Sequence, residues 1–502
     1  MVCLVYGIAV FGFQAYTYSA PYYKAYYFKS HMFVFAQTLE NTASVVGSVF
    51  ETHGASSMSE SGTRSSDFAE SVPVLMYHGI LNTTDGSNID LDTFIDQMTT
   101  LKNAGYQTVT IDDFYSFLKG EKKLPNKSFL LTFDDGRKDT YYPVDPILRA
   151  LHFNAVMFAI EKFSLLDANN YYLTKSELQA MEKSGRWEIE SHTRTHRNLE
   201  TVPQSELGNE IVGSKEGLEG LLGKSIIAFA FPFGELGQES TNISQRSVMS
   251  IAEKAYAMSF FQFFTTKRFT QNYPVPSQNG HYLVKRISVL PEWSGKNLLS
   301  TIHQGEAKPI PFNPKLTNDD GWINTLWGEM AFENSHLMVR ANPGGTGSVI
   351  ILDGSHEWKD YQFSTNLLWH GGSNLYLWAR YQDDENYAAC NFGNDLVHVE
   401  ETVGGVTNVI KGNEVTNENL LKQNSFIASI RVYGRTVECL INGHVLAKTE
   451  FLDEHLSRGG IGIKVWDHVN GTSALEVTRV LVESIAFSST STVKTTSRAI
   501  EK

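Results

Sequence analysis

The spacing of hydrophobic and polar residues divides the chain into two regions of different character. From Val72 to about His303, short apolar runs alternate with segments whose apolar residues recur at helical spacing. The runs that predict strands are Val72–Tyr77, Gln107–Thr110, Ser128–Phe133, Ala155–Ile160, Trp187–Glu190 and Ile226–Ala230. The segments that predict helices include Leu91–Ala104, Thr140–Leu151, Thr174–Ser184 and Ser205–Leu222. Repeated β-α units of this kind predict a parallel sheet, either open or closed into a barrel.

The second region begins after the proline-rich stretch Pro309–Pro314. Between about Leu316 and Phe487, helical periodicity almost disappears, and short alternating or aromatic-rich runs are separated by glycine, asparagine and aspartate turns. These runs include Tyr361–Trp369, Asn374–Tyr381, Phe426–Tyr433 and Thr436–Ile441. The pattern predicts an all-β sandwich. We expect its tryptophans to lie mainly in the core, as is usual in sandwiches, among them Trp358, Trp369, Trp378 and Trp466.

These patterns suggest an organisation for the 502 residues. We expect an apolar N-terminal segment at 1–50, a Ser/Gly-rich linker at 51–71, an α/β domain at 72–308, a Pro-rich linker at 309–315, a β-sandwich at 316–487 and a disordered tail at 488–502. Residues Met1–Ala20 are apolar enough to span a bilayer and to act as a membrane anchor. Against this, no Lys or Arg precedes them while Lys24 and Lys29 follow, the reverse of the order expected for export.

Composition narrows the class of protein. Hydrophobic residues make up 42% of the chain and charged residues 19%, which excludes a polytopic membrane protein or a largely disordered one. The net charge of −13, without a cluster of Lys and Arg, argues against nucleic acid as a partner and favours a neutral or cationic polymer. None of the three cysteines has Cys-x-x-Cys spacing. Cys390 and Cys439 can pair in a secreted protein or remain free thiols in a core.

Two short motifs place metal-binding side chains at strand ends of the α/β domain. The apolar run Ser128–Phe133 stops abruptly at Asp134 and Asp135, so two carboxylates stand where a buried strand leaves the core. Just past a later predicted strand, His192 and His196 have a spacing that puts both imidazoles on one face of a helical turn. Either motif alone is common on ordinary surfaces. Because parallel strands end at one rim, however, a carboxylate and two imidazoles there would supply three metal ligands and leave a position for water.

Two further strand ends carry candidate catalytic groups. The segment Phe229–Gly234 contains rigid Pro232 and permissive Gly234, so it can aim a backbone N–H into the site and stabilise an oxyanion. An ordinary strand-to-helix turn is the alternative. The first predicted strand is followed by His78, which suits either an acid/base role at the rim or a place in the core.

Together these motifs resemble those of the polysaccharide deacetylases, the NodB-homology or carbohydrate esterase group. Thr-Phe-Asp-Asp-Gly, Ser-His-Thr-x-Thr-His and Phe-Ala-Phe-Pro-Phe-Gly occur in this order along the α/β region. The resemblance implies a distorted (β/α) barrel and a hydrolase that removes N-acetyl, and sometimes O-acetyl, groups from a glycan. It implies a divalent metal, most often zinc, with cobalt, nickel and manganese as other candidates. By motif, Asp134 would be the general base, Phe233 the backbone donor to the oxyanion, and the metal ligands would be Asp135, His192 and His196.

Three features depart from the usual pattern of that family. Ala230 stands where an arginine commonly orients the base, and Arg286 can take its place from a later strand. The Asp-x-x-Asp-Trp motif is absent, although Trp293 can line the acetyl pocket. His303 matches the usual Leu-x-His motif of the proton donor imperfectly, whereas Met-Tyr-His at the start of the domain resembles the permuted arrangement of poly-N-acetylglucosamine deacetylases. We therefore expect His78 to be the general acid and keep His303 as the alternative.

The resulting hypothesis is a secreted or cell-surface deacetylase that its N-terminus can anchor to a membrane. Its expected partner is an acetylated polysaccharide such as poly-N-acetylglucosamine, chitin or peptidoglycan. One alternative is an O-acetyl xylan or glycan esterase, because the same chemistry cleaves esters more easily than amides. Another is a non-catalytic glycan-binding or adhesion protein, motivated by Ala230 and the missing motif. The sandwich resembles concanavalin-type, laminin-G-like domains, and we expect it to bind glycan.

Overall fold

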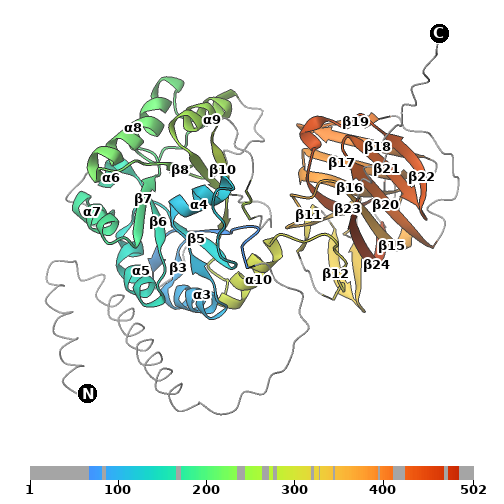
Figure 1. Ribbon diagram of the computed structural model, residues 1–502, viewed down its shortest axis with the longest axis horizontal. Helices are drawn as coiled ribbons and strands as arrows, with labels where there is room; N and C mark the ends of the chain where they lie inside the picture. Colours follow the sequence, from blue (N-terminus) through green and yellow to red (C-terminus); the bar gives the residue numbers. More distant parts are fainter. Residues whose placement is uncertain are drawn as a thin grey trace, which may run out of the picture. The chain divides into compact units, whose positions relative to one another are not determined.

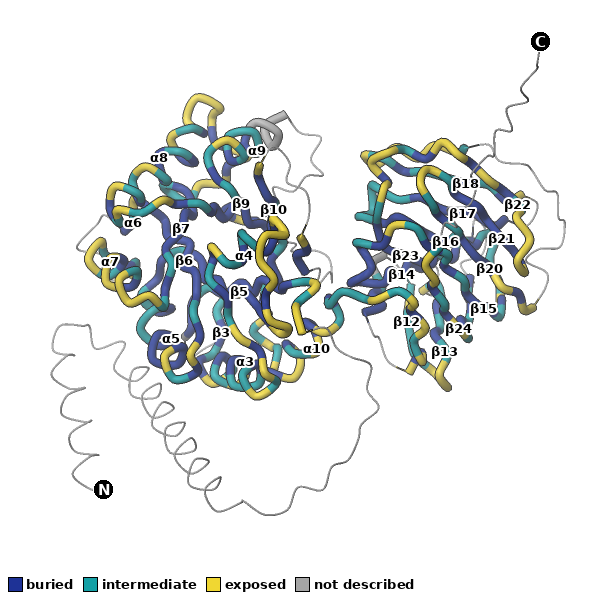
Figure 2. Tube along the Cα trace, viewed as in Figure 1, coloured by how far each residue is buried: buried dark blue, intermediate teal, exposed yellow. Residues whose placement is uncertain are grey.

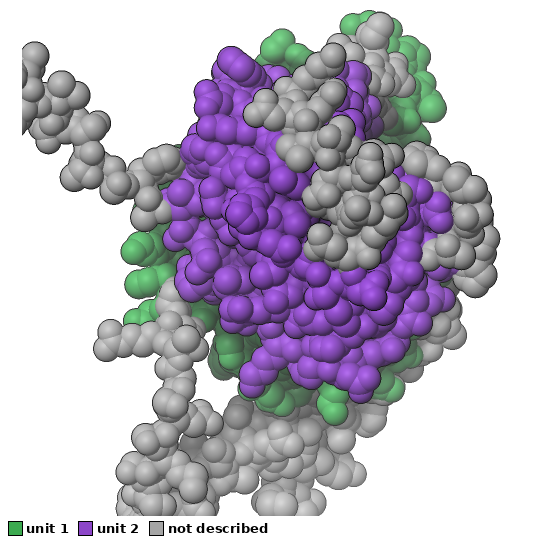
Figure 3. All heavy atoms as spheres, turned by 90° about the vertical axis from the view of Figure 1, so that its right-hand side faces the viewer, with its two compact units in different colours: residues 1–307 green, residues 308–502 purple. Residues whose placement is uncertain are grey.

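The computed structural model describes residues 67–81, 86–164, 171–234, 243–262, 271–274, 280–317, 321–326, 328–342, 345–393, 396–410, 424–467 and 473–485. The expected membrane anchor, most of the expected linker after it and the expected tail lie outside these residues. Among the helices that the structure describes, none is long and apolar enough to cross a membrane. The chain forms two compact units, Met1–Ala307 and Lys308–Lys502, shown as a ribbon in Figure 1 and by colour in Figure 3.

The first unit is built on a parallel sheet with the strand order β1-β10-β9-β8-β7-β6-β5-β4. The strands are β1 (Val74–Tyr77), β4 (Gln107–Thr108), β5 (Ser128–Phe133), β6 (Ala155–Ala159), β7 (Trp187–Ser191), β8 (Ala228–Ala230), β9 (Met258–Gln262) and β10 (Tyr282–Ser288). Because β1 pairs with β10 on one side and with β5 on the other, the sheet closes into a barrel, with β4 added at the edge of β5. Two short strands, β2 (Ile80–Leu81) and β3 (Ile89–Asp90), pair with each other.

Helices surround the barrel (Figure 1). They are α3 (Leu91–Asn103), α4 (Ile111–Leu118), α5 (Lys138–Leu151), α6 (Glu161–Ser164), α7 (Lys175–Lys183), α8 (Gln204–Leu222), α9 (Ile243–Ala255) and α10 (Gly295–Gly305). In most barrel strands, alternate side chains enter two apolar layers, so that in β6 Met157 and Ala159 face the helices while Val156 and Phe158 face the barrel interior. Phe114 of α4 joins the interior layer. The interior is therefore packed (Figure 2), and polar chemistry is left to the rim.

The second unit is a sandwich of two seven-stranded antiparallel sheets. One sheet has the order β11-β14-β23-β16-β17-β18-β19 and contains β11 (Trp322–Leu326), β14 (Gly347–Leu352), β16 (Asn374–Asp383), β17 (Asn386–Gly393), β18 (Val397–Val403), β19 (Val406–Ile410) and β23 (Gly460–Trp466). The other has the order β12-β13-β24-β15-β20-β21-β22 and contains β12 (Glu329–Glu333), β13 (His336–Arg340), β15 (Tyr361–Gly371), β20 (Ser425–Tyr433), β21 (Thr436–Ile441), β22 (His444–Thr449) and β24 (Ala474–Ser484). A 3₁₀ helix, η2 (Glu454–Leu456), precedes β23.

The inner faces of the two sheets share one apolar cluster. Trp358 and Trp369 belong to it, as expected, whereas Trp378 is buried outside this cluster. Cys390 of β17 and Cys439 of β21 form a disulfide, which resolves the choice between a pair and free thiols and links the two sheets.

The expected architecture, a (β/α) barrel followed by an all-β sandwich, is confirmed. Several predicted strand boundaries differ from the observed ones by one or two residues, and two of these differences are explained by local contacts. The strand predicted over 107–110 ends early because Thr110 is the N-cap of α4. The strand predicted over 226–230 begins only at Ala228, and just before it the amide of Ile227 donates to the side chain of Glu190 rather than to a neighbouring strand.

Candidate active site

Asp134 and Asp135 lie where β5 leaves the barrel, beside the end of β1. The Asp134 amide donates to the Tyr77 carbonyl at 3.1 Å, which carries the β1-β5 register to the rim. The backbone then turns sharply, with left-handed conformations at Asp135 (φ 76°) and Gly136 (φ 70°). A Cβ on Gly136 would already lie 3.4 Å from Ala159, so this turn packs closely on β6. The turn gives the two adjacent carboxylates different surroundings.

A buried arginine holds Asp134. Arg286 of β10 donates from Nη1 to Oδ1 at 2.6 Å and from Nη2 to Oδ2 at 2.8 Å, and neither side chain is more than 2% exposed. Nη2 also lies 3.3 Å from Oε1 of Gln262, the last residue of β9. Burial by itself raises the pKa of Asp134, but the charge of Arg286 and the hydrogen bonds it donates outweigh burial and lower that pKa to about 2. Asp134 is therefore ionised and fixed in orientation.

His192 and His196 lie in the loop after β7, and the helical turn suggested by their spacing was wrong. Thr193 (φ 66°) and His196 (φ 58°) are left-handed, which a right-handed helix does not allow. The His196 amide donates to the Thr193 hydroxyl at 2.9 Å, and buried Glu210 of α8 accepts the amide and the hydroxyl of Thr195 at 3.0 and 2.6 Å. These bonds fold the loop so that the two imidazole centroids are 4.8 Å apart.

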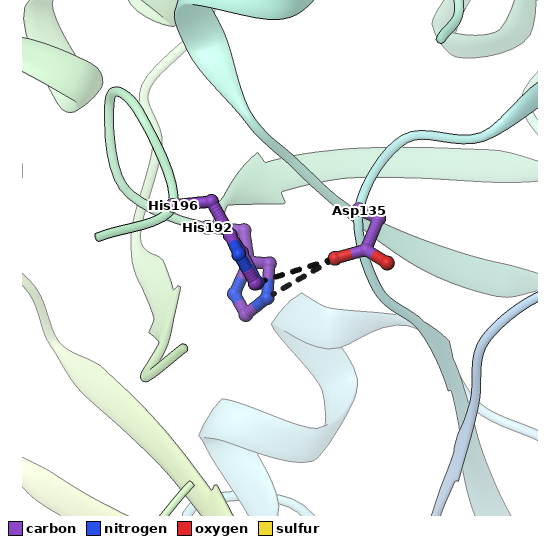
Figure 4. A group of neighbouring side chains, drawn as sticks. All are labelled: Asp135, His192 and His196. Atoms are coloured by element: carbon purple, nitrogen blue, oxygen red, sulfur yellow. Dashed lines mark ion pairs between the residues drawn. The ribbon is translucent and has the colours of Figure 1, made fainter. Parts of the chain in front are cut away.

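Asp135, His192 and His196 converge on one point (Figure 4), where one ligand atom of each lies within 4.8 Å of the others. Nε2 of His192 is 3.6 Å and Nε2 of His196 is 3.4 Å from Oδ1 of Asp135. Nδ1 of His192 lies 2.9 Å from the Ala230 carbonyl, so Nδ1–H donates a hydrogen bond to that oxygen and Nε2 keeps a lone pair. Burial lowers the pKa of His192 to about 3 and lowers the pKa of His196 as well, so both imidazoles are neutral.

The loop after β8 brings Phe233 to the same place. The Phe233 ring is 53% exposed, and its centroid lies 5.0 Å from that of His196. Phe233 is left-handed (φ 62°), as are Asp135 and His196, and each such residue costs about 1–3 kcal/mol. Among the residues that the structure describes, no acceptor takes the Phe233 amide. Gly234 makes the loop possible, since a Cβ there would lie 2.2 Å from Cγ of Gln262.

The two candidate proton donors lie at opposite ends of the barrel. His78 directly follows β1, and burial raises the pKa of Asp135 while nearby His78 opposes that rise. His303 lies on α10 with its ring 6.3 Å from that of Tyr106, which packs against Phe129 near the start of β5. At roughly 3.3 Å per strand residue, that end is about 16 Å from Asp134. Of the two histidines, His78 is therefore the one that lies near the aspartate pair.

Trp293, expected near the acetyl pocket, follows β10. Its carbonyl accepts a hydrogen bond from Gln97 at 2.7 Å, and the Tyr77 hydroxyl donates to the same Gln97 at 2.9 Å. Trp293 is partly buried against the layer between strands and helices. It is thus tied to the end of β1 that carries His78.

Two features of this rim were missed by the sequence analysis. Gln262 braces Arg286, and as the one polar residue within the apolar run Phe260–Phe264 it could have drawn attention to itself. Tyr171 is 43% exposed, lies under the guanidinium of Arg137 at 4.9 Å from its ring, and accepts the Lys138 amide at 2.9 Å. This pairing places an exposed aromatic ring on the chain segment that directly follows Asp135.

Comparison with known proteins identifies the family of the barrel. A family described as polysaccharide deacetylase matches residues 121–250, which include both the aspartate pair and the histidine pair. The barrel belongs to the polysaccharide deacetylase family. The protein YxkH of Bacillus subtilis (strain 168), named for the same family, is 28% identical over 224 residues that cover 45% of this chain and 73% of its own.

Two further relatives of this deacetylase domain match only part of the chain. The poly-beta-1,6-N-acetyl-D-glucosamine N-deacetylase of Staphylococcus aureus (strain MRSA252) is 28% identical over 180 residues, which cover 32% of this chain and 60% of that enzyme. The solved Streptococcus pyogenes deacetylase PplD, in complex with acetate, has 26% identity and a TM-score of 0.40, with 46% of this chain and 98% of that chain covered. All three matches cover less than half of this chain, whose second unit is the sandwich.

Within the deacetylase domain, the arginine that holds Asp134 lies on a different strand from the one that the motif predicts. Ala230 of β8 contributes only its methyl group to the interior layer. Arg286 reaches Asp134 from β10, with its guanidinium 5.5 Å from the ring of Phe158. The substitution at position 230 therefore leaves Asp134 with an arginine partner.

Proposed function

We propose that the deacetylase domain hydrolyses the N-acetyl groups of a β-linked N-acetylglucosamine polysaccharide and that it uses a divalent metal. The observation that carries this proposal is the convergence of Asp135, His192 and His196 beside a second carboxylate, Asp134, that Arg286 holds separately. Three residues can thus hold the ion while a fourth remains available for proton transfer.

The three converging side chains fit a metal site. Oδ1 of Asp135 is buried and has no hydrogen-bond partner among the described residues, although two imidazole nitrogens face it. Two neutral imidazoles and one carboxylate form a common ligand set of hydrolytic zinc, and cobalt, nickel or manganese would accept it as well. When bound, the metal would polarise the acetyl carbonyl and acidify a water molecule.

The residues of the chain supply the remaining chemistry. Asp134 accepts the proton of the attacking water. Its ion pair with Arg286 makes the carboxylate less basic but fixes its orientation. Water adds to the carbonyl carbon while the Phe233 N–H donates to the developing oxyanion, an interaction worth about 3 kcal/mol in comparable sites. The C–N bond then breaks, acetate leaves, and His78 protonates the departing amine.

A relative supports the proposed class of substrate, and the disulfide supports the proposed location of the enzyme. The Staphylococcus aureus relative is named for poly-beta-1,6-N-acetyl-D-glucosamine, which supports a polymer of this class. The Cys390–Cys439 disulfide is typical of proteins in an oxidising compartment, which supports action outside the cell or at its surface.

The test is acetate release from a panel of N-acetylated polymers (poly-β-1,6-N-acetylglucosamine, chitin oligosaccharides and peptidoglycan) and O-acetylated xylan. We expect release from an N-acetylated polymer. Asp134→Asn should retain metal and lose turnover, and His192→Ala should lose both metal and turnover. His303→Ala should keep both. Release from xylan alone would indicate the esterase, and no release from any polymer with zinc or cobalt added would indicate a binding protein. A parental rate for Asp134→Asn would refute its role.

A further inference from the structure

A second group of functional side chains lies on the outer face of the sandwich sheet that contains β16, β17, β18 and β23. In β16, Leu375 and Leu377 face the core, so Tyr376 between them faces outwards. In β23, Ile463 and Val465 face the core, and Lys464 and Trp466 therefore face outwards. Tyr376 is the register partner of Lys464. Two aromatic rings and a cation thus meet on one sheet face, outside the core.

Lys464 is a cation with uncommitted donors. Its Nζ lies 4.7 Å from the ring centroid of Tyr376 and 4.9 Å from that of Trp466. Within the described residues it has no hydrogen-bond acceptor and no ion-pair partner. Lys464 is partly buried, and this burial lowers the pKa of its ammonium. A partly buried ammonium that has no acceptor in the described part of the chain is well placed to donate to a ligand.

A chain of hydrogen bonds orders the acceptors beside Lys464. Asn374 donates to Asn391 at 2.8 Å, Asn391 donates to Oε1 of Glu400 at 2.7 Å, and Nε2 of His398 lies 2.8 Å from the same oxygen. The strand register places Tyr376 opposite Asn391 and Asn391 opposite His398. Nδ1 of His398 is buried and has no partner among the described residues. The polar groups of this face are therefore fixed in position with bonding capacity to spare.

Stacked aromatic rings extend this face along β16. The Trp378 ring lies 4.3 Å from that of Tyr387 at an interplanar angle of 21° and 5.5 Å from that of Tyr381 at 11°. Trp378 is only 3% exposed, so this stack supports the sheet face from the side. Tyr376 is two residues away, roughly 7 Å along the strand.

We propose that this outer face, formed by Tyr376, Lys464, Trp466, Asn391 and Glu400, binds a neutral glycan chain. Aromatic rings pack against the C–H faces of sugar rings, and the ammonium, amide and carboxylate pair with hydroxyl or acetamide groups. The positive charge of Lys464 and the negative charge of Glu400 balance each other, which favours a neutral chain over a polyanion. This binding is separate from the proposed hydrolysis and would hold the protein on a polysaccharide whether or not acetyl groups are removed.

The experiment uses the full chain with Asp134→Asn, so that no glycan is consumed. Retention is measured by affinity electrophoresis in gels that contain laminarin, xylan or soluble chitin oligosaccharide-grafted polymer, with alginate as the anionic comparison. We expect retention by at least one neutral glycan, weakened about tenfold or more by Lys464→Met and by Trp466→Ala. Lys448→Met on the other sheet, a matched loss of charge, should leave retention unchanged.

A second measurement separates the two proposals. In the parent chain, Lys464→Met and Trp466→Ala should leave acetate release from a short chitin oligosaccharide unchanged, while Lys464→Gln, which keeps a donor, should retain glycan more strongly than Lys464→Met. Equal retention of the parent and both variants would overturn the outer-face site, as would stronger retention by alginate than by the neutral glycans, or no retention by any of them. If the parent chain is retained by glycan but releases no acetate, the result counts against the proposed active site and leaves the outer-face site standing.

Discussion

The ion pair between Asp134 and Arg286 allows a prediction whose sign and size follow from the structure. Arg286→Met removes the charge and keeps much of the volume, so the Asp134 carboxylate is left buried without a partner. Breaking a buried pair in this way costs about 3–5 kcal/mol. For a unit of this size, that corresponds to a fall of roughly 10 °C in the unfolding temperature. We expect this fall in the barrel transition of the metal-free full chain, measured by scanning calorimetry at neutral pH.

The pH dependence gives a second signature. The pKa of Asp134 in the folded protein is lowered to about 2 from its ordinary value of 3.8. Its contribution of about 2 kcal/mol to stability is therefore present above pH 3.8 and is lost as the pH falls through 2. In Arg286→Met, burial is no longer opposed by that charge, the Asp134 pKa rises, and mild acid should stabilise the variant relative to neutral pH.

Two control variants complete this test. Arg286→Met combined with Asp134→Asn removes both charges and should recover most of the lost stability. Lys285→Met removes a charge from the neighbouring residue of β10, whose side chain points to the other side of the strand, and should change little. The reasoning fails if Arg286→Met costs less than about 1 kcal/mol, or if the double variant is no more stable than the single one.

Three further predictions concern other parts of the chain. Burial raises the pKa of Glu190 to about 8, so Glu190 lowers the stability of the folded protein increasingly as the pH rises towards that value. Glu190→Gln should therefore be more stable than the parent in alkaline but not in acidic buffer. Equal dependence of stability on pH in the two proteins would contradict this. Tyr171→Ala should raise KM for a polymer several-fold and leave kcat nearly unchanged, whereas Phe68→Ala, the control at another exposed aromatic residue, should change neither KM nor kcat. A fall in kcat alone would argue against a binding role for Tyr171. Replacing Cys390 and Cys439 by serine removes a cross-link between residues 49 positions apart and should lower the free energy of unfolding of the sandwich by about 4 kcal/mol. An unchanged midpoint of chemical unfolding would refute this.

The sequence predicted those parts of the site that depend on strand ends. The strand Ser128–Phe133 has the predicted bounds because a buried parallel strand is a continuous apolar run. The same logic placed Asp134 at the rim. The proximity of His192 and His196 was expected for the wrong reason, since the helical spacing was replaced by a left-handed loop that Glu210 holds from α8.

The remaining features depend on contacts that no local pattern encodes. Strand β9 was missed because the apolar run in the sequence continues beyond Gln262 through Phe264, so no polar residue marks its end. Tyr171 reaches the rim through backbone pairing with Lys138, which is distant in sequence. The pairing of Cys390 with Cys439 depends on two strands in opposite sheets, and their spacing of 49 residues carries no signal of its own.

The most direct test of the central claim is a zinc titration of the chelated full chain, with acetate release from a soluble N-acetylglucosamine oligomer as the readout. We predict that release is absent without metal, rises linearly with added zinc and levels off at one ion per chain, and that Asp135→Ala shows neither tight zinc binding nor release. Full acetate release from the chelated protein, or an unchanged titration in Asp135→Ala, would contradict the account.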